Sequence, residues 1–192
     1  MKTLTWLLIA LPLLASDPQD FAVRVEAKKD GRTFGGSGTV INSGKQTHVL
    51  TNEHVVREAD SVSVVKDGRY IKAELLAANP SVDLALLKVK EKMAGASLAD
   101  QEPTVGSEVR TFGHPDWKLT PKVGKALGNV DNAKQEGARV WYSTIHPEPG
   151  DSGCGVFDRE GRLVAVNWGG YTDACCVSLA DVKRFLKDHA KE

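Results

Sequence analysis

A serine held between glycines is the first feature of this sequence that could do chemistry. The stretch Gly-Asp-Ser-Gly occupies residues 150–153, directly after Pro149. Glycines let a backbone turn sharply and bring its N–H groups close to a substrate carbonyl, so Ser152 is a candidate nucleophile. The same residue types also build ordinary surface turns. A catalytic role therefore requires a base and an orienting carboxylate elsewhere, because a serine hydroxyl is a weak nucleophile at neutral pH.

Both partners occur in suitable settings. His54 follows a short apolar run that is typical of the end of a buried strand, and Asp83 directly precedes a second apolar run that indicates shielding from water. A shielded carboxylate beside a histidine fixes the imidazole tautomer and stabilises the imidazolium formed in catalysis. Taken singly, His54 is better explained as a strand-end histidine and Asp83 as a turn residue. The catalytic interpretation therefore depends on the three residues together.

Four motifs in this order resemble trypsin-like serine peptidases of the chymotrypsin fold, most closely the bacterial Deg/HtrA-type protease domain. They are Gly-Ser-Gly-Thr-Val-Ile at 36–41, Leu-Thr-Asn-Glu-His-Val-Val at 50–56, Asp-Leu-Ala-Leu-Leu-Lys-Val at 83–89 and Gly-Asp-Ser-Gly at 150–153. Phe-Gly-His-Pro at 112–115 and Val-Gly-Lys-Ala-Leu-Gly at 123–128 also resemble segments of that group's second barrel. The similarity extends from about residue 21 to the C-terminal helix.

The resemblance assigns a role to each candidate residue. It implies that His54 is the general base and acid, that Asp83 orients it, and that Ser152 is the nucleophile. It also implies an oxyanion hole made by the backbone N–H groups of Gly150 and Ser152. The implied activity is that of a serine endopeptidase, which cleaves protein or peptide substrates through an acyl-enzyme. A non-catalytic peptide-binding protein and an esterase-like hydrolase are the alternatives, and the presence of all three triad residues favours an enzyme.

Short strands dominate the rest of the chain. Apolar and polar residues alternate over 21–27 and over parts of 61–65 and 70–75, and Gly, Asn, Asp and Pro clusters separate these runs. This pattern predicts an all-β barrel or sandwich. Ser178 is the expected N-cap of one closing helix, with Asp181 as its capping partner. The resemblance implies two six-stranded antiparallel β-barrels with the active site between them.

The N-terminus is typical of a secretory signal peptide. Lys2 supplies a positive charge, an apolar run follows, and small residues at Ala15 and Ser16 permit cleavage. We therefore expect a signal peptide at residues 1–16, a mature peptidase domain at 17–192, and a secreted or periplasmic protein. Apolar periodicity fades over 91–103, which places the first barrel at about 17–98 and the second at about 99–192.

Composition argues against several other functions. The chain of 192 residues carries 25 basic and 25 acidic side chains and has no basic stripe with interleaved aromatic residues. Nucleic-acid binding is therefore disfavoured, as is attraction to an anionic membrane. No transmembrane segment is expected in the mature chain. Its three cysteines lack the paired spacing that identifies a metal site, so we expect neither a metal nor a cofactor.

Substrate selection is expected at the stretch Val-Asn-Trp-Gly-Gly, residues 166–170. By resemblance, Asn167, Trp168 and Gly169 line the primary specificity pocket and pair with the substrate backbone, and Gly169 leaves the pocket entrance open. Counting back six residues from Ser152 gives His146 as the pocket floor. A preference for Lys or Arg would need an acid there, so we predict against it, although His146 is equally consistent with a plain loop residue.

Two features near the serine depart from the Deg pattern. Deg-type enzymes usually have Asn at the position of Asp151. An aspartate there matches the motif of digestive-type enzymes instead, in which its carboxylate pairs with a newly cut N-terminal amine. No activation sequence is evident here, so we expect Asp151 to find another donor locally. Cys154 replaces a glycine, and the strand beside the pocket holds Cys175 and Cys176. A disulfide from Cys154 to Cys175 or to Cys176 is plausible, and a vicinal bridge is the third option.

Overall fold

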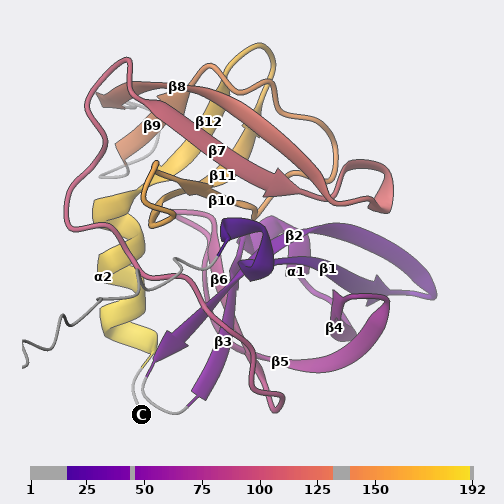
Figure 1. The fold of residues 1–192 in the computed structure, drawn as a ribbon. Coiled ribbons are helices and arrows are strands. Elements are labelled where there is room, and N and C mark those ends of the chain that lie inside the picture. The colour runs from indigo at the N-terminus through magenta and orange to yellow at the C-terminus, as the bar shows by residue number, and fades with distance from the viewer. Residues whose placement is uncertain (1–16, 44–45, 132–138, 191–192) are drawn as a thin grey trace, which may run out of the picture.

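The computed structural model describes residues 17–43, 46–131 and 139–190. Its strands form two closed antiparallel barrels, which Figure 1 shows one above the other. The predicted signal peptide at 1–16 lies outside the described residues. The all-β prediction with two six-stranded barrels and a closing helix is confirmed.

The first barrel contains six strands in the spatial order β1-β2-β3-β6-β5-β4. Their bounds are β1 Ala22–Lys29, β2 Arg32–Ser43, β3 Gln46–Thr51, β4 Ser61–Lys66, β5 Arg69–Asn79 and β6 Leu84–Val89. Asp-Gly turns explain two of its hairpins. Asp30 and Gly31 have φ of 49° and 72°, and Asp67 and Gly68 have φ of 51° and 75°. Two successive positive φ values match the twist of the flanking strands, and Asp-Gly adopts them readily.

The second barrel has the spatial order β10-β11-β12-β9-β8-β7. Its strands are β7 Glu108–Gly113, β8 Thr120–Asp131, β9 Arg139–Ser143, β10 Gly155–Phe157, β11 Leu163–Gly170 and β12 Ala174–Ser178. The connection between the barrels runs from β6 to β7. Short helical segments complete the described chain: the 3-10 turns η1 Pro18–Phe21 and η2 Pro115–Trp117, and the single-turn helix α1 Glu53–Val56.

Three apolar clusters form the core of the two barrels. One fills the interior of the first barrel mainly with valines, and another fills the second barrel around the fully buried Trp141. The third joins the barrels, because it packs Leu84 and Leu86 of β6 against Phe112 and Phe157 of the second barrel. Burying a large apolar side chain stabilises a fold by about 1.5–3 kcal/mol, so this shared cluster fixes how the barrels meet.

The C-terminal helix α2, Leu179–His189, lies beside both barrels (Figure 1). Its predicted cap is confirmed: the Ser178 hydroxyl accepts a hydrogen bond from the Asp181 N–H at 3.3 Å. The helix buries Leu179, Val182 and Phe185. Leu179 joins the apolar cluster of the second barrel, and Val182 and Phe185 join the cluster that both barrels share. These contacts give the chain a firmly packed C-terminal element.

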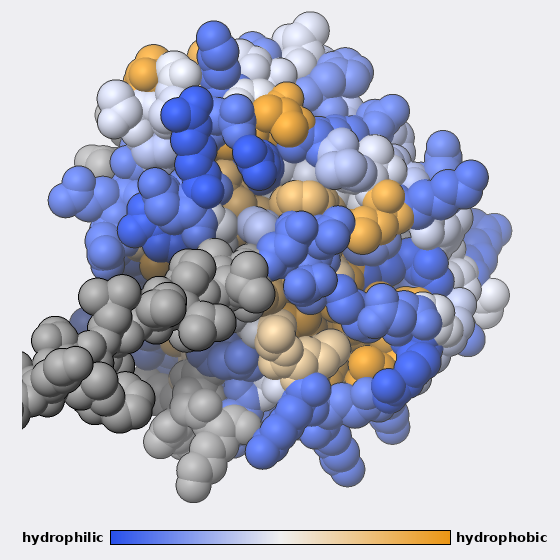
Figure 2. Space-filling view, in the orientation of Figure 1, coloured by the Kyte–Doolittle hydropathy of each residue, from blue (hydrophilic) through white to orange (hydrophobic). Residues whose placement is uncertain are grey.

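The surface is mainly hydrophilic on the face that Figure 2 shows, with small separate apolar patches. This agrees with the equal numbers of acidic and basic residues in the sequence. Within the described ranges, no helix has the length and apolar character needed to cross a membrane.

Candidate active site

The three candidate catalytic residues come from the two barrels. His54 lies on α1, directly after strand β3, and Asp83 lies in the turn that enters β6 of the same barrel. Ser152 lies in the loop between β9 and β10 of the second barrel. The structure brings His54 and Ser152 to the wall of one hollow of about 380 Å³, so the site lies where the barrels meet.

A pair of short hydrogen bonds joins the histidine to the aspartate. The His54 Nδ1 and Asp83 Oδ2 atoms are 2.6 Å apart, and the His54 backbone N–H donates to Asp83 Oδ1 at 2.8 Å. The carboxylate thus accepts from two groups of one residue, which fixes both the position and the rotation of the imidazole. With Nδ1 donating to the carboxylate, Nε2 is left as the ring's basic nitrogen.

The turn before β6 aims this carboxylate. Asp83 adopts the left-handed region with φ of 52°, a conformation that aspartate tolerates better than most residues. The buried Asn52 amide donates to the Asp83 carbonyl at 2.8 Å and holds the turn in place. Asp83 is itself buried, so its bonds to His54 are shielded from competing water.

The serine is in the same hollow, and its hydroxyl is bonded to a backbone carbonyl rather than to the imidazole. Ser152 Oγ donates to the Trp168 carbonyl at 3.3 Å. Among the described residues, no hydrogen bond links it to His54. Hydrogen bonds between catalytic groups are often absent or long without substrate and form only in the reacting complex. The missing hydrogen bond between Ser152 and His54 is therefore compatible with a catalytic pair.

The loop around the serine has a backbone that only glycine fits. Gly150 has φ of +103°, and a Cβ there would lie 2.7 Å from the His114 carbonyl oxygen. Gly153 has φ of +87° and a similarly closed environment. Within the described part of the chain, the N–H groups of Gly150 and Ser152 have no acceptor. Two free N–H groups beside a candidate nucleophile are suited to binding a developing oxyanion.

Ser37 of β2 ties this loop to the first barrel. Its backbone N–H donates to the Ser152 carbonyl at 2.7 Å, and its hydroxyl donates to the Gly150 carbonyl at 2.7 Å. The same hydroxyl accepts from the His114 N–H at 2.9 Å. Burial lowers the pKa of His114 to about 4, with smaller contributions from nearby cations, so its ring is neutral at neutral pH.

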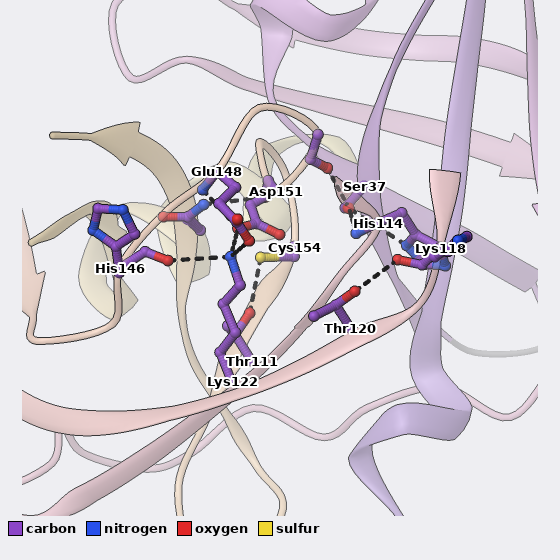
Figure 3. A network of polar contacts seen from close by, with 12 residues as sticks. Ser37, Thr111, His114, Lys118, Thr120, Lys122, His146, Glu148, Asp151 and Cys154 are labelled. Atoms are coloured by element: carbon purple, nitrogen blue, oxygen red, sulfur yellow. Dashed lines mark hydrogen bonds and ion pairs between the residues drawn. The ribbon is translucent and has the colours of Figure 1, made fainter. Parts of the chain in front are cut away.

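Asp151 has found the local donor that we expected. Its carboxylate is almost fully buried, and Oδ2 lies 2.6 Å from the Lys122 ammonium (Figure 3). The Glu148 backbone N–H donates to the same oxygen at 2.9 Å. Burial lowers the pKa of Lys122, but its hydrogen bonds to Asp151 and Glu148 outweigh burial, so the pKa is raised overall.

The predicted substrate contacts lie in three different settings. Trp168 and Gly169 stand at the cleft: the Trp168 carbonyl meets the serine hydroxyl, and a Cβ on Gly169 would enter open space. The Asn167 side chain instead is buried and donates to the Asp151 carbonyl at 3.1 Å, so it supports the loop from behind. His146 is exposed, with Nδ1 3.4 Å from the Thr172 carbonyl oxygen.

No disulfide is formed in this structure: Cys154, Cys175 and Cys176 are free thiols. The Cys154 sulfur lies 2.8 Å from the Thr111 hydroxyl oxygen, and burial raises the pKa of this thiol to about 12. Cys176 sits in register opposite Asn167, whereas Cys175 pairs with Gly169. An intervening β11 residue thus separates Cys154 from Cys176 across the sheet. No cluster of potential metal ligands occurs among the described residues.

Two closed six-stranded barrels with a His–Asp pair and a serine loop between them define the trypsin-like class. Comparison with known families agrees. Residues 36–166 match the family model described as "Trypsin-like peptidase domain". The chain therefore belongs to the family of trypsin-like peptidase domains.

Curated relatives include the "Periplasmic pH-dependent serine endoprotease DegQ" of Escherichia coli K12, which is 31% identical over 140 residues. The "Probable periplasmic serine endoprotease DegP-like" of Halomonas elongata is 32% identical over 138 residues. Each match covers 69% of this chain but only 30% and 28% of the respective relative. Among solved structures, the active form of the Rv3671c protease from M. tuberculosis has a TM-score of 0.79 at 19% identity, with 100% of this chain and 95% of that chain covered. That likeness concerns the fold.

The sequence did not single out three of the residues that build this site. Ser37 lies inside the Gly-Ser-Gly motif, but the motif does not predict that Ser37 bonds to the serine loop. Asn52 lies in the histidine motif in the same way. Nothing in the sequence distinguishes Lys122 from the rest of the 25 Lys and Arg residues of the chain. Its role arises only from its ion pair with Asp151 in the folded protein.

Proposed function

We propose that this protein is a serine endopeptidase that uses Ser152, His54 and Asp83 as its catalytic triad. The observation that carries the proposal is the doubly bonded His54–Asp83 pair on the same hollow as Ser152. Membership of the trypsin-like peptidase family and the serine endoprotease names of its relatives support it. The relatives are more than three times longer than the matched segment, so the activity is proposed for this domain on its own geometry.

The chemistry follows from the groups at the site. Ser152 Oγ attacks the scissile carbonyl carbon and passes its proton to His54 Nε2, while the carbonyl oxygen takes up negative charge. The N–H groups of Gly150 and Ser152 bind that oxygen. His54 then protonates the leaving amine as the C–N bond breaks, which leaves an acyl-enzyme. Water, activated by the same imidazole, hydrolyses the ester and restores the serine.

Labelling with a fluorophosphonate probe tests this proposal directly. The wild-type protein is expected to be labelled, and Ser152→Ala is expected to abolish labelling without unfolding. Ser61→Ala is a matched control, because Ser61 is an exposed serine on β4. A folded wild-type protein that stays unlabelled would favour the alternative of a non-catalytic peptide-binding protein. Cleavage of a casein or peptide substrate separates a peptidase from an esterase-like hydrolase.

We further propose that the enzyme does not prefer Lys or Arg before the scissile bond. His146 takes the position of the pocket floor in the resemblance, and it offers an imidazole rather than the carboxylate that a basic side chain needs. The open space at Gly169 leaves the entrance accessible. A peptide-library profile dominated by basic residues at that position would contradict this proposal.

Export is a separate proposal. It is supported by the signal-like sequence of residues 1–16 and by the word periplasmic in the names of the relatives. Fractionation with N-terminal sequencing tests it: we expect a mature N-terminus after Ala15 or Ser16 in an exported fraction. Intact protein that begins at Met1 in the cytoplasm would contradict export.

A further inference from the structure

A buried charge lies in the middle of the loop that would catalyse the reaction. Asp151 stands between Gly150 and Ser152, the two residues whose N–H groups face the reacting carbonyl, and its side chain is 1% exposed. An ionised carboxylate removed from water is strongly unfavourable unless an opposite charge and hydrogen bonds compensate it. Whatever compensates this charge therefore determines where the loop can sit.

Only one of the two carboxylate oxygens is compensated. Oδ2 accepts from Lys122 Nζ at 2.6 Å and from the Glu148 N–H at 2.9 Å. Oδ1 is buried and has no hydrogen-bond partner within the described chain. It is pressed against Gly113, where an added Cβ would lie 2.0 Å from it. The carboxylate has no room to turn on this side. In the described structure, Lys122 is its single cationic partner.

Lys122 is itself fully engaged. Its ammonium lies 2.6 Å from Asp151 Oδ2 and 2.5 Å from Glu148 Oε2, and it donates to the His146 carbonyl at 3.1 Å. These acceptors match the three N–H groups of an ammonium. Figure 3 shows the lysine reaching up from β8 to meet all three on the loop that precedes Ser152. One strand of the second barrel thus anchors the loop at residues 146, 148 and 151.

We propose that Lys122 is a positioning residue that holds the Gly150–Ser152 loop in its oxyanion-binding form through Asp151. This inference rests on the proposed serine peptidase function and deepens it. In digestive-type enzymes the corresponding carboxylate is neutralised by an N-terminal amine that appears on cleavage. Here a lysine inside the fold provides the positive charge, so the loop needs no proteolytic activation step to be assembled.

Removing the ammonium leaves the buried carboxylate uncompensated, and the loop then has to move to reach water. The Lys122→Met variant is expected to react with a fluorophosphonate about a hundredfold more slowly than wild type, on the scale of losing an oxyanion donor. Asp151→Asn removes the charge while keeping an oxygen for Lys122 and for the Glu148 N–H, so its labelling rate is expected to fall less than that of Lys122→Met. Adding Asp151→Asn to Lys122→Met is expected to restore labelling to within a few-fold of wild type. Lys125→Met on the same strand, where Lys125 is exposed, serves as the control.

Acid provides a second readout. Protonation of Asp151 in Lys122→Met neutralises the stranded charge, so the ratio of variant to wild-type labelling rises as the pH falls. A lysine that only supports the fold would not give this rise. Should Lys122→Met fail to fold, the double variant Lys122→Met with Asp151→Asn still tests the proposal. A double variant that folds and is labelled supports the proposal, and one that folds but is not labelled overturns it. A Lys122→Met variant that is labelled at the wild-type rate also overturns the proposal. A wild-type protein that is not labelled overturns the peptidase function itself.

Discussion

The two halves of the proposed active site are held in different ways. The base half is self-contained: Asp83 and His54 belong to one barrel, and a single carboxylate fixes the imidazole through two bonds to the same residue. The nucleophile half depends on distant segments, because Ser37, Lys122 and Asn167 each hold a different part of the loop around Ser152. The base is therefore set by one local contact, whereas the nucleophile is set by the assembly of both barrels.

This difference separates two kinds of variant. Changes to the base half should alter chemistry while leaving the fold intact, since few other contacts depend on the His54–Asp83 pair. Changes to the nucleophile half should alter rate and stability together, since each tie also joins elements of the fold. Lys122→Met belongs to the second kind, and the following predictions test the contrast from the largest effect to the smallest.

The largest effect beyond loss of the serine itself is expected for Asp83→Asn. An amide in place of the carboxylate favours the wrong imidazole tautomer, and a loss of about 10⁴-fold in kcat is typical for this change in a Ser-His-Asp triad. We expect little change in the melting temperature, because the hydrogen bond from the Asn52 side-chain amide to the backbone carbonyl of residue 83 is retained. Measuring kcat on a peptide substrate and the melting temperature of the same sample checks both parts. A large fall in melting temperature would show that the base half is not self-contained.

Ser37→Ala should give a smaller loss of rate and a clear loss of stability. The change removes the hydroxyl that accepts from the His114 N–H and donates to the Gly150 carbonyl, and both groups are part-buried. A buried polar group left without its partner costs about 1–3 kcal/mol. We expect about tenfold slower fluorophosphonate labelling together with a lower denaturation midpoint, with Ser61→Ala as the unaffected control. Unchanged labelling despite a lower midpoint would mean that Ser37 supports the fold but not the loop.

The same contrast explains how far the sequence could go. His54, Asp83 and Ser152 stand in short local motifs, and the resemblance of those motifs to trypsin-like peptidases predicts the two-barrel fold, which the structure confirms. The catalytic roles of the three residues stay a prediction. Lys122 could not be predicted, because its role arises from β8 lying beside the serine loop in space, which no local pattern encodes. Asn167 was placed by resemblance at the substrate, but its side chain is buried behind the loop. Cys154, Cys175 and Cys176 are free thiols in this structure, and the pairing suggested for Cys154 stays a prediction, because the sequence does not give the distance between two sulfur atoms on neighbouring strands.

The smallest effect concerns His48, which lies on β3 of the base half but takes no part in the site. It is 1% exposed, and neither ring nitrogen has a hydrogen-bond partner within the described residues. Burial, and to a lesser extent Lys88, lowers the pKa of His48 below its ordinary 6.5. The unfolded chain therefore binds a proton that the folded chain excludes, and stability falls as the pH drops below 6.5. His48→Met removes both the unsatisfied nitrogens and this titration, and apolar groups of similar shape are tolerated well at such positions.

We expect His48→Met to raise the free energy of unfolding by about 1 kcal/mol at pH 7 and by more at pH 5. Urea denaturation at the two pH values measures this, and His189→Met, at the solvent-exposed end of α2, is the matched control. Fluorophosphonate labelling at pH 7 should not change, because His48 is not among the residues that line the hollow with His54 and Ser152. A change in labelling would show that the base half, like the nucleophile half, depends on packing beyond its own carboxylate. An equal gain at both pH values would instead show that His48 has the same pKa in the folded and the unfolded chain.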